Sequence, residues 1–308
     1  MDHPVYLKGI SYELEEPRPL QQLPEVQRSP DLLANLQAVG VAAFSVSRRS
    51  PAELAAACAK RTLWKAKTDP AEVDLLFYAT TTFGEPRFYG GDVQAMIGRL
   101  GLVNAYPVGV TLSECANVVI ALALAADALR SGRCRNALIV TADKVLEGES
   151  RVVPPEVSVG SDCAASVLLT SQGTGPWELL GGERLIIPLD GEGRAHEDFA
   201  RYLKTSARGI QEITGRTLAA AGREPDDFSW LITNNYNQSV SRLFASQSGF
   251  DPAKVYTANI ARYGHGFGAD NLINLSDCAG EHPPDAGDLV LLLASGPNMW
   301  ATAVLRRT

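Results

Sequence analysis

This sequence has few histidines, fewer basic than acidic residues, and no long apolar run. The 308 residues include only four histidines, so any chemistry that needs an imidazole base has few candidates. No apolar run reaches the ~20 residues that span a bilayer, and the charged, proline-broken N-terminus is not typical of a signal peptide. Lys and Arg number 28 against 35 Asp and Glu, and the net charge of −7 argues against nucleic-acid binding. The sequence therefore predicts a soluble, cytoplasmic protein with neither a membrane nor a nucleic-acid partner.

The cysteines are odd in number, widely separated and never arranged as C-x-x-C. They are Cys58, Cys115, Cys134, Cys163 and Cys278. This spacing argues against a disulfide framework or a metal site and favours single thiols, buried or reactive. Cys115 differs from the others because it directly precedes ANVVIALALAADALRSG, a helical sequence whose N-terminus would favour a thiolate. The alternative is that Cys115 is a small buried apolar residue, as we expect for the other four.

Short runs rich in Val, Ile and Leu alternate with helical patterns along the chain. Continuous apolar runs are typical of strands buried on both faces of a sheet. We expect strands at residues 73–80, 136–143, 165–170, 229–234 and 288–295, and helices after residue 50 and at 91–100, 116–132 and 198–221. The first helix carries a capping box, because Ser50 is followed three residues later by Glu53. The pattern predicts an α/β fold with helices on both faces of a sheet.

An internal repeat divides the chain. DPAEVDLLFYAT, residues 69–80, lines up with EPDDFSWLITNN, residues 224–235, and each enters a strand through an acidic-Pro turn. Each half then reaches a polar turn, around Cys115 in the first and around His265 in the second. A pseudo-twofold axis between the halves would bring both turns to one site. A chance similarity between two generic α/β units is the alternative.

The best boundary between the two units is SQGTGPWELLGGE, which begins at residue 171. We expect residues 1–171 to form the half that carries the cysteine nucleophile. Residues 172–308 then form the half that carries Asn234 and His265.

Three segments carry a family resemblance. One is TLSECANVVIALALAADALRSGRCRNALIVTADK, in which Cys115 precedes a helix and then a strand; the second is VSVGSDCAASVLLT. The third is DLVLLLASGPNMWATAVLRR, in which Gly296 and Trp300 match a G-G-G-x-x-W-G-S ending. From about Leu54 to the C-terminus, the chain resembles type III β-ketoacyl-ACP synthases of the thiolase superfamily. The resemblance implies a thiolase-like fold, two pseudo-twofold related α/β halves in α-β-α-β-α layers, and a homodimer.

Two positions depart from this family. Its H-Q-A-N motif is replaced by Asn234-Asn235-Tyr236-Asn237, so the usual catalytic His maps onto Asn234. Its G-N-T-S-A turn is replaced by GHGFG, so the usual Asn maps onto His265. The exchanged pair resembles non-decarboxylating thiolases, in which the His activates the Cys. Ketosynthases use His and Asn together to stabilise an enolate. A single neutral imidazole that activates a thiol supports acyl transfer but not that stabilisation.

These residues predict an acyltransferase with no permanently bound cofactor and no metal. Cys115 would accept an acyl or aryl group from a CoA or acyl-carrier-protein thioester, which presents it on phosphopantetheine. His265 would be the base, and Asn234 would position His265 or a water molecule. The backbone N–H groups of Cys115 and Gly296 would form the oxyanion hole, because Pro297 has none. The acceptor would be an O, N or S nucleophile on a small molecule, in secondary-metabolite biosynthesis.

Weaker signals concern substrate binding. Phe83 and Phe88 are candidates for an aryl pocket, although packing in an aromatic core is the alternative. Arg48 and Arg49 are candidates for binding a CoA phosphate or an acidic carrier protein, although a solvated surface pair is the alternative.

Two other functions stay open at this point. One is a decarboxylating β-ketoacyl synthase that uses the exchanged pair. The other is a non-catalytic partner subunit of a ketosynthase-like heterocomplex, against which the retained Cys115 and His265 both argue.

Overall fold

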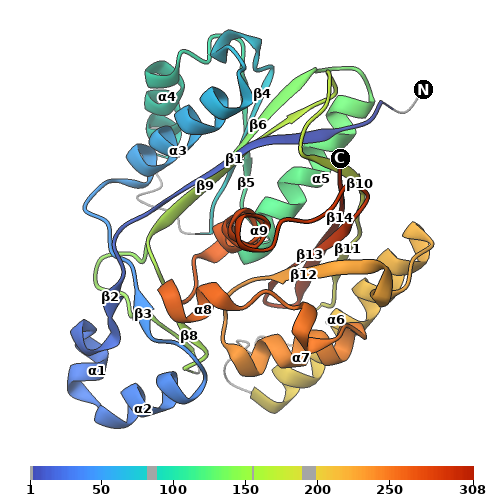
Figure 1. Cartoon of the computed structure of the whole chain (residues 1–308). Helices are drawn as coiled ribbons and strands as arrows, with labels where there is room; N and C mark the ends of the chain where they lie inside the picture. Colours follow the sequence, from blue (N-terminus) through green and yellow to red (C-terminus); the bar gives the residue numbers. More distant parts are fainter. Residues whose placement is uncertain (1–2, 82–88, 155, 189–198) are drawn as a thin grey trace.

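A large mixed sheet organises the computed structural model, which describes residues 3–81, 89–154, 156–188 and 199–308 (Figure 1). Its strands are β1 Tyr6–Leu14, β4 Leu75–Ala79, β5 Tyr106–Val110, β6 Asn136–Asp143, β9 Cys163–Thr170, β10 Trp177–Gly181, β11 Arg184–Ile186, β12 Phe228–Thr233, β13 Leu289–Gly296 and β14 Met299–Arg307. They are ordered β12-β13-β14-β10-β1-β9-β6-β4-β5, and β11 pairs with β14. Short strands form two small ribbons: β2 Arg18–Pro19 with β3 Ala43–Phe44, and β7 Val152–Val153 with β8 Ser158–Val159.

Helices pack on the outer surfaces of this sheet and also between its two parts, which are the strands on either side of β1 in the sheet order. They are α1 Pro24–Arg28, α2 Pro30–Ala38, α3 Pro51–Ala66, α4 Tyr89–Leu100, α5 Asn117–Arg130, α6 Phe199–Ala221, α7 Gln238–Ser248, α8 Ala258–Tyr263 and α9 Asp270–Glu281. Helix α3 packs on β6 and β9 with α4 beside it, and α6 packs on β14 with α7 beside it. Helices α5 and α9 lie in the centre (Figure 1), where Val118, Leu122, Leu272 and Ile273 have no exposed surface. The predicted α-β-α-β-α layering is therefore confirmed.

The strand pairing repeats in the two halves. Strand β4 pairs parallel with β6, and β6 pairs antiparallel with β9 along its whole length. In the second half, β12 pairs parallel with β13, and β13 pairs antiparallel with β14 along its whole length. The internal repeat seen in the sequence is thus a repeat of sheet topology.

Strand β1 joins the two parts of the sheet. Leu7 is paired with Leu169 of β9 on one side and with Trp177 of β10 on the other. Strands from residues 1–171 lie on one side of this junction and strands from 172–308 on the other. The boundary at residue 171 itself stays a prediction.

Local sequence explains where several elements begin. The capping box of α3 is present, because the Glu53 N–H donates to Ser50 Oγ (3.2 Å) and the Ser50 N–H donates to Glu53 Oε2 (2.9 Å). The two acidic-Pro turns form short 3-10 helices, η2 Pro70–Glu72 before β4 and η4 Pro225–Asp227 before β12. In the described ranges, no helix is both long and apolar enough to cross a membrane.

Candidate active site

Cys115 lies in a tight turn between the edge strand β5 and the central helix α5. The turn contains a 3-10 helix, η3 Glu114–Ala116, and the side chain of Asn117 holds it closed. Asn117 Oδ1 accepts from the Ser113 N–H (2.9 Å), and Asn117 Nδ2 donates to the carbonyl oxygens of Thr80 (2.8 Å) and Thr111 (2.9 Å). Cys115 is thereby fixed at the start of α5, where the positive end of the helix dipole favours negative charge.

The five thiols fall into two groups by exposure. Cys115 is partly exposed, whereas Cys58, Cys134, Cys163 and Cys278 are buried. Burial raises the pKa of Cys58 to about 12, of Cys134 to about 11 and of Cys278 to about 12, and it raises the pKa of Cys163 well above its usual value. A thiol that stays protonated is a poor nucleophile. Cys115 is therefore the best placed of the five for chemistry.

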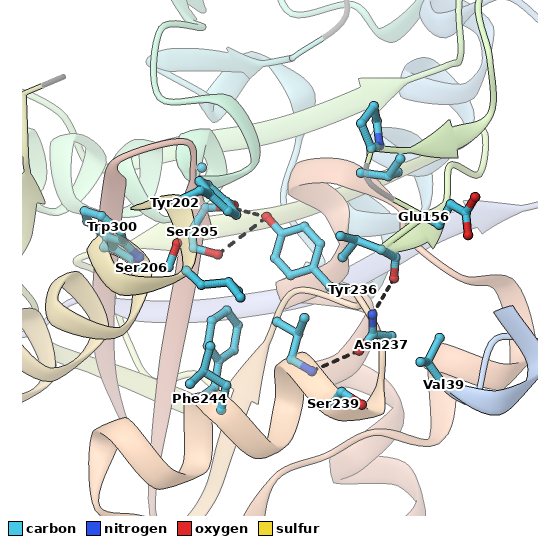
Figure 2. Close-up of a pocket in the computed structure, with 17 residues that line it drawn as sticks. Val39, Glu156, Tyr202, Ser206, Tyr236, Asn237, Ser239, Phe244, Ser295 and Trp300 are labelled. Atoms are coloured by element: carbon cyan, nitrogen blue, oxygen red, sulfur yellow. Dashed lines mark hydrogen bonds between the residues drawn. The ribbon is translucent and has the colours of Figure 1, made fainter. Parts of the chain in front are cut away.

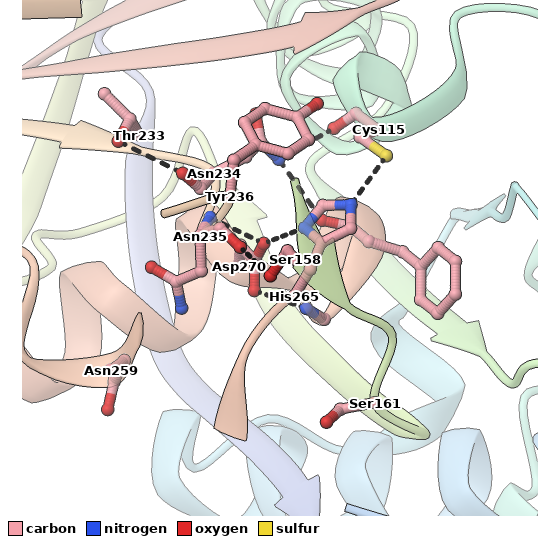
Figure 3. Close-up of polar contacts among 12 residues, drawn as sticks. Cys115, Ser158, Ser161, Thr233, Asn234, Asn235, Tyr236, Asn259, His265 and Asp270 are labelled. Carbon is pink, nitrogen blue, oxygen red and sulfur yellow. Dashed lines mark hydrogen bonds and ion pairs between the residues drawn. The ribbon is translucent and has the colours of Figure 1, made fainter. Parts of the chain in front are cut away.

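His265 reaches the same point from the second half of the chain. Its backbone N–H donates to the carbonyl oxygen of Val159 (2.9 Å), and its own carbonyl oxygen accepts from the Ser161 N–H (2.8 Å). The buried imidazole then places Nε2 3.2 Å from Cys115 Sγ (Figure 3). The predicted meeting of the two turns is present in the geometry.

The two turns correspond, but the two reactive residues are offset within them. Glu114 in η3 and Phe267 in η6 Phe267–Ala269 both have a left-handed backbone, with φ of 51° and 54°, just before the central helices α5 and α9. When Glu114 is aligned with Phe267, Gly268 is the residue equivalent to Cys115. His265 lies three positions before Gly268 in its own turn. His265 and Cys115 therefore meet from non-equivalent positions of the two turns.

Asp270 is a third member of the cluster that sequence reasoning missed. Its Oδ2 lies 2.6 Å from His265 Nδ1, on the side of the ring away from Cys115 (Figure 3). Asp270 is fully buried at the first position of α9, and its carboxylate also accepts from the backbone N–H groups of Asn235 (2.8 Å) and Gly266 (2.7 Å). A carboxylate in this position fixes the imidazole tautomer and orients Nε2 toward the thiol. The available signal was an acidic residue five positions after the histidine, in GHGFGAD.

Two negative neighbours control the charge of His265. Burial by itself lowers the pKa of His265, but the negative charges of Cys115 and Asp270, with their hydrogen bonds, overcome it and raise the pKa to about 10. The ring therefore holds a proton at neutral pH. This differs from the neutral resting imidazole expected from the sequence, because that expectation counted neither the influence of Cys115 on the pKa of the ring nor that of Asp270.

Asn234 bonds to backbone groups on three sides of the cluster. Its Nδ2 donates to the carbonyl oxygens of Cys115 (3.4 Å) and Phe267 (3.2 Å), and its Oδ1 accepts from the Ser295 N–H (2.9 Å). These contacts join the cysteine turn, the histidine turn and the end of β13. Asn234 is thus brought into the cluster as a connector of backbone segments.

Gly296, at the end of β13, packs directly on the cysteine turn. A Cβ atom at this position would lie 2.8 Å from the Ser113 carbonyl oxygen and 2.9 Å from Glu114 Cβ. Only a residue without a side chain allows the strand to approach so closely. The backbone of residues 295–296 therefore lies beside the turn that carries Cys115.

A pocket of about 370 Å³ adjoins the cluster at Tyr236, Ser295 and Gly296 (Figure 2). Its lining is mostly apolar and comes mainly from α6, α7 and the segment around Val153, with Glu156, Ser206, Asn237 and Ser239 among its polar members. Volume and lining are typical of a small-molecule site. Tyr236 was not singled out by sequence reasoning, and its ring lies 4.8 Å from the ring of His265.

The weaker substrate-binding candidates either lie away from the pocket or fall outside the residues that the structure describes. Phe83 and Phe88 fall outside the described residues. Arg49 donates to Glu13 Oε2 (2.8 Å) and Glu15 Oε1 (3.0 Å), so its guanidinium is engaged in ion pairs within the chain. Arg48 is exposed. Neither arginine lines the pocket described above.

Comparison with known proteins finds related sequences over most of the chain. Residues 218–307 match the family model described as 3-oxoacyl-[acyl-carrier-protein] synthase III, C terminal. The chain is 28% identical to β-ketoacyl-[acyl-carrier-protein] synthase III of Rhodospirillum rubrum, over 85% of this chain and 86% of the relative. The corresponding synthase III of Aquifex aeolicus is 27% identical, over 82% of this chain and 83% of the relative.

Solved structures share the fold over nearly the whole chain. ChlB3, described as an acyltransferase, superposes with a TM-score of 0.85 at 21% identity, covering 99% of this chain and 98% of that one. The 3-oxoacyl-[acyl-carrier-protein] synthase III of Aquifex aeolicus superposes with a TM-score of 0.81 at 21% identity, covering 98% and 99%. The chain is thus similar in sequence to type III β-ketoacyl-[acyl-carrier-protein] synthases and shares their thiolase fold.

Proposed function

We propose that this protein is an acyltransferase that works through an acyl-enzyme on Cys115. The observation that carries the proposal is the 3.2 Å separation between Cys115 Sγ and His265 Nε2, with Asp270 on the far side of the ring. A nucleophile, a base and a group that orients the base are the three parts of covalent acyl transfer. The thiolase fold by itself carries several reactions, so the site decides between them.

In the first step, the Cys115 thiolate attacks the carbonyl carbon of a thioester, a new C–S bond forms, and the carbonyl oxygen becomes an oxyanion. The backbone N–H groups of Cys115 and Gly296 stabilise that oxyanion. When the oxyanion collapses, the C–S bond of the donor breaks and the departing thiolate takes the proton from His265 Nε2. The acyl group remains on Cys115.

In the second step, His265 acts as the base. Acylation removes the negative charge of Cys115, which is the strongest influence raising the pKa of His265, so the pKa of the ring falls. An acceptor hydroxyl, amine or thiol gives its proton to Nε2 as its heteroatom attacks the acyl carbon. The bond to Cys115 breaks, and the thiolate returns beside a protonated imidazole.

The donor is a thioester of CoA or of an acyl carrier protein, and no cofactor is permanently bound. The names of the relatives, β-ketoacyl-[acyl-carrier-protein] synthase III, support the carrier-protein donor. The mostly apolar pocket next to Gly296 is the proposed binding site. We place the reaction in the cytoplasm, where thiols stay reduced. The acyl or aryl group goes to a small secondary-metabolite acceptor.

Incubation with a panel of acyl-CoA and acyl-carrier-protein donors, followed by mass spectrometry of the intact protein, tests the proposal. We expect an acyl adduct that maps to Cys115 and disappears in Cys115→Ala. Cys58→Ala and Cys278→Ala serve as matched controls, because both thiols are buried outside the cluster and should leave the adduct unchanged. No adduct with any donor would favour a non-catalytic partner subunit. An adduct followed by carbon–carbon bond formation would favour a β-ketoacyl synthase.

We propose in addition that two chains associate through β5. This strand ends the sheet order, and an open sheet edge pairs readily with another strand. Val103, Tyr106 and Leu112 on and beside β5 are large apolar side chains that stay largely exposed in the single chain. Sedimentation should give the mass of a homodimer, and Tyr106→Glu should shift it toward the monomer. A monomer in the wild type would contradict the proposal.

A further inference from the structure

Tyr236 occupies the boundary between the pocket and the cysteine–histidine pair. Its ring faces His265 at 4.8 Å with an interplanar angle of 32°, and it also lines the pocket (Figures 2 and 3). Its hydroxyl donates to the backbone carbonyl oxygen of Ser295 at 2.7 Å. One side chain therefore contacts the imidazole with its ring and the end of β13 with its hydroxyl.

The Ser295 carbonyl that accepts this hydrogen bond and the Gly296 N–H belong to the same peptide group. A donor on the oxygen withdraws electron density from the amide and makes its N–H a stronger donor, because hydrogen bonds in a chain polarise one another. The Ser295 N–H is held from the other side by Asn234 Oδ1 at 2.9 Å. Two adjacent peptide groups are thus fixed by side chains that follow β12.

We infer that Tyr236 is a positioning residue for the oxyanion hole, acting through the Ser295–Gly296 peptide. The inference rests on the proposed acyl transfer, in which the Gly296 N–H binds the oxyanion. The Tyr236 hydroxyl fixes the direction of that N–H and strengthens it, while the Tyr236 ring packs against His265. The two parts of the side chain serve two different groups and can be separated by substitution.

Tyr236→Phe keeps the ring and removes the hydroxyl. Complete loss of an oxyanion-hole donor commonly costs about 100- to 1000-fold in rate. Here the donor would remain and only be weakened and less well fixed, so we expect acylation to slow by about 10-fold. The loss should appear in the maximal rate of acylation and leave the donor concentration for half-saturation within about two-fold, because the interaction forms with the oxyanion and not with the bound donor.

The test compares two reactions of Cys115 in the same proteins. S-phenyl thioacetate acylates the thiol through an oxyanion, whereas iodoacetamide alkylates it without one. Tyr236→Phe should slow acylation about 10-fold and leave alkylation and its pH profile unchanged, since the ring still packs on His265. Tyr236→Leu, which removes the ring as well, should also change the alkylation profile. Tyr256→Phe is the matched control, because its hydroxyl donates to Glu281 outside the site.

Each outcome has a clear consequence. Wild-type acylation rates in Tyr236→Phe would overturn the inference and leave the acyltransferase proposal intact. A parallel loss of acylation and alkylation would also overturn it, because the hydroxyl would then act on the thiol and not on the oxyanion. A wild-type protein that is alkylated but never acylated would overturn the proposed function and this inference together. Thermal unfolding of each variant confirms that rates are compared between folded proteins.

Discussion

The carboxylate of Asp270 lies 2.6 Å from His265 Nδ1, opposite the nitrogen that faces Cys115. The two residues are only five positions apart, and the 3-10 helix η6 turns the chain so that one side chain supports the other. Gly266 between them is required by space, because a Cβ there would lie 2.9 Å from Asp270 Oδ1 and 2.9 Å from Cys163 Sγ. The histidine turn and the start of α9 thus form one preassembled unit.

Asp270→Asn should slow acylation of Cys115 by at least about 100-fold, within the range seen when a carboxylate that orients a catalytic imidazole is lost. The amide would remove a negative charge from beside the ring and would no longer fix its tautomer. Stopped acylation reactions analysed by mass spectrometry give the rate.

Asp277→Asn is the matched control for this change. Asp277 lies on the same helix and accepts from Tyr12, Asn259 and Arg262, outside the cluster. We expect its acylation rate to match the wild type. Rates for Asp270→Asn within about three-fold of the wild type would show that Asp270 only supports the fold, since loss of an orienting carboxylate costs far more.

His265→Ala should lower turnover by about 100-fold or more, which is the usual cost of losing a general base. His282→Ala should turn over like the wild type, because His282 stacks on Trp230 at the end of α9, away from the cluster. Steady-state turnover with the donor identified by mass spectrometry measures both. Equal losses in the two variants would contradict the assignment of His265.

The proton on His265 should be directly observable. Because the pKa is shifted upward from 6.5 to about 10, the ring keeps its proton between these values and loses it as the pH rises further. Acylation should therefore decline as the pH approaches 10, when the departing thiolate no longer finds a proton. NMR titration of labelled histidine should show the pKa of His265 falling in Cys115→Ala, since the thiolate is the strongest influence raising it. An unchanged titration would contradict the charged pair.

Apolar patterning in the sequence was sufficient for the strands buried on both faces. Strands β6 and β13 are fully buried along their length, and the sequence places both within one residue of their observed bounds. Strand β1 was missed, because YLKGISYEL mixes polar residues into a strand that is only partly buried. Helix α9 was missed for a different reason: it lies in the central layer yet buries Asn271 and Asn274, and polar residues hide a helix from apolar periodicity.

The sequence predicted those site residues whose type and neighbours in the chain already indicate a function. Cys115 before an apolar helix and His265 among glycines both stand out in one sequence. Asp270 and Tyr236 do not, because their roles depend on the folded geometry: the η6 turn places Asp270 against the imidazole, and Tyr236 reaches the end of β13. The ion-paired Arg49 illustrates the converse, since nothing in the sequence reveals that Glu13 and Glu15 lie beside it.

Asn234→Ala should slow acylation by about 10- to 100-fold, as expected when a group that orients catalytic residues is removed. The substitution removes the bonds that join Cys115, Phe267 and Ser295. Asn259→Ala is a matched loss of a buried amide bonded to Asn274 and Asp277, and it should affect thermal stability without affecting acylation. Parallel effects of the two variants on both readouts would reduce Asn234 to a structural role.

Wild-type protein should not release carbon dioxide from malonyl thioesters through Cys115. Decarboxylative condensation needs donors for an enolate oxygen, and the resemblance to ketosynthases implies a His and an Asn for that purpose. Here Asn234 Nδ2 donates to two backbone carbonyl oxygens. Of the two residues, His265 is therefore the one left to donate to an enolate oxygen. Loss of one such donor costs about 3–4 kcal/mol, or two to three orders of magnitude in rate. Transfer of an intact acyl group to an alcohol or amine forms no enolate and avoids this cost. Labelled malonyl-carrier protein, assayed with wild type and with Cys115→Ala, decides the matter: rapid release that depends on Cys115 would reject acyl transfer in favour of a β-ketoacyl synthase.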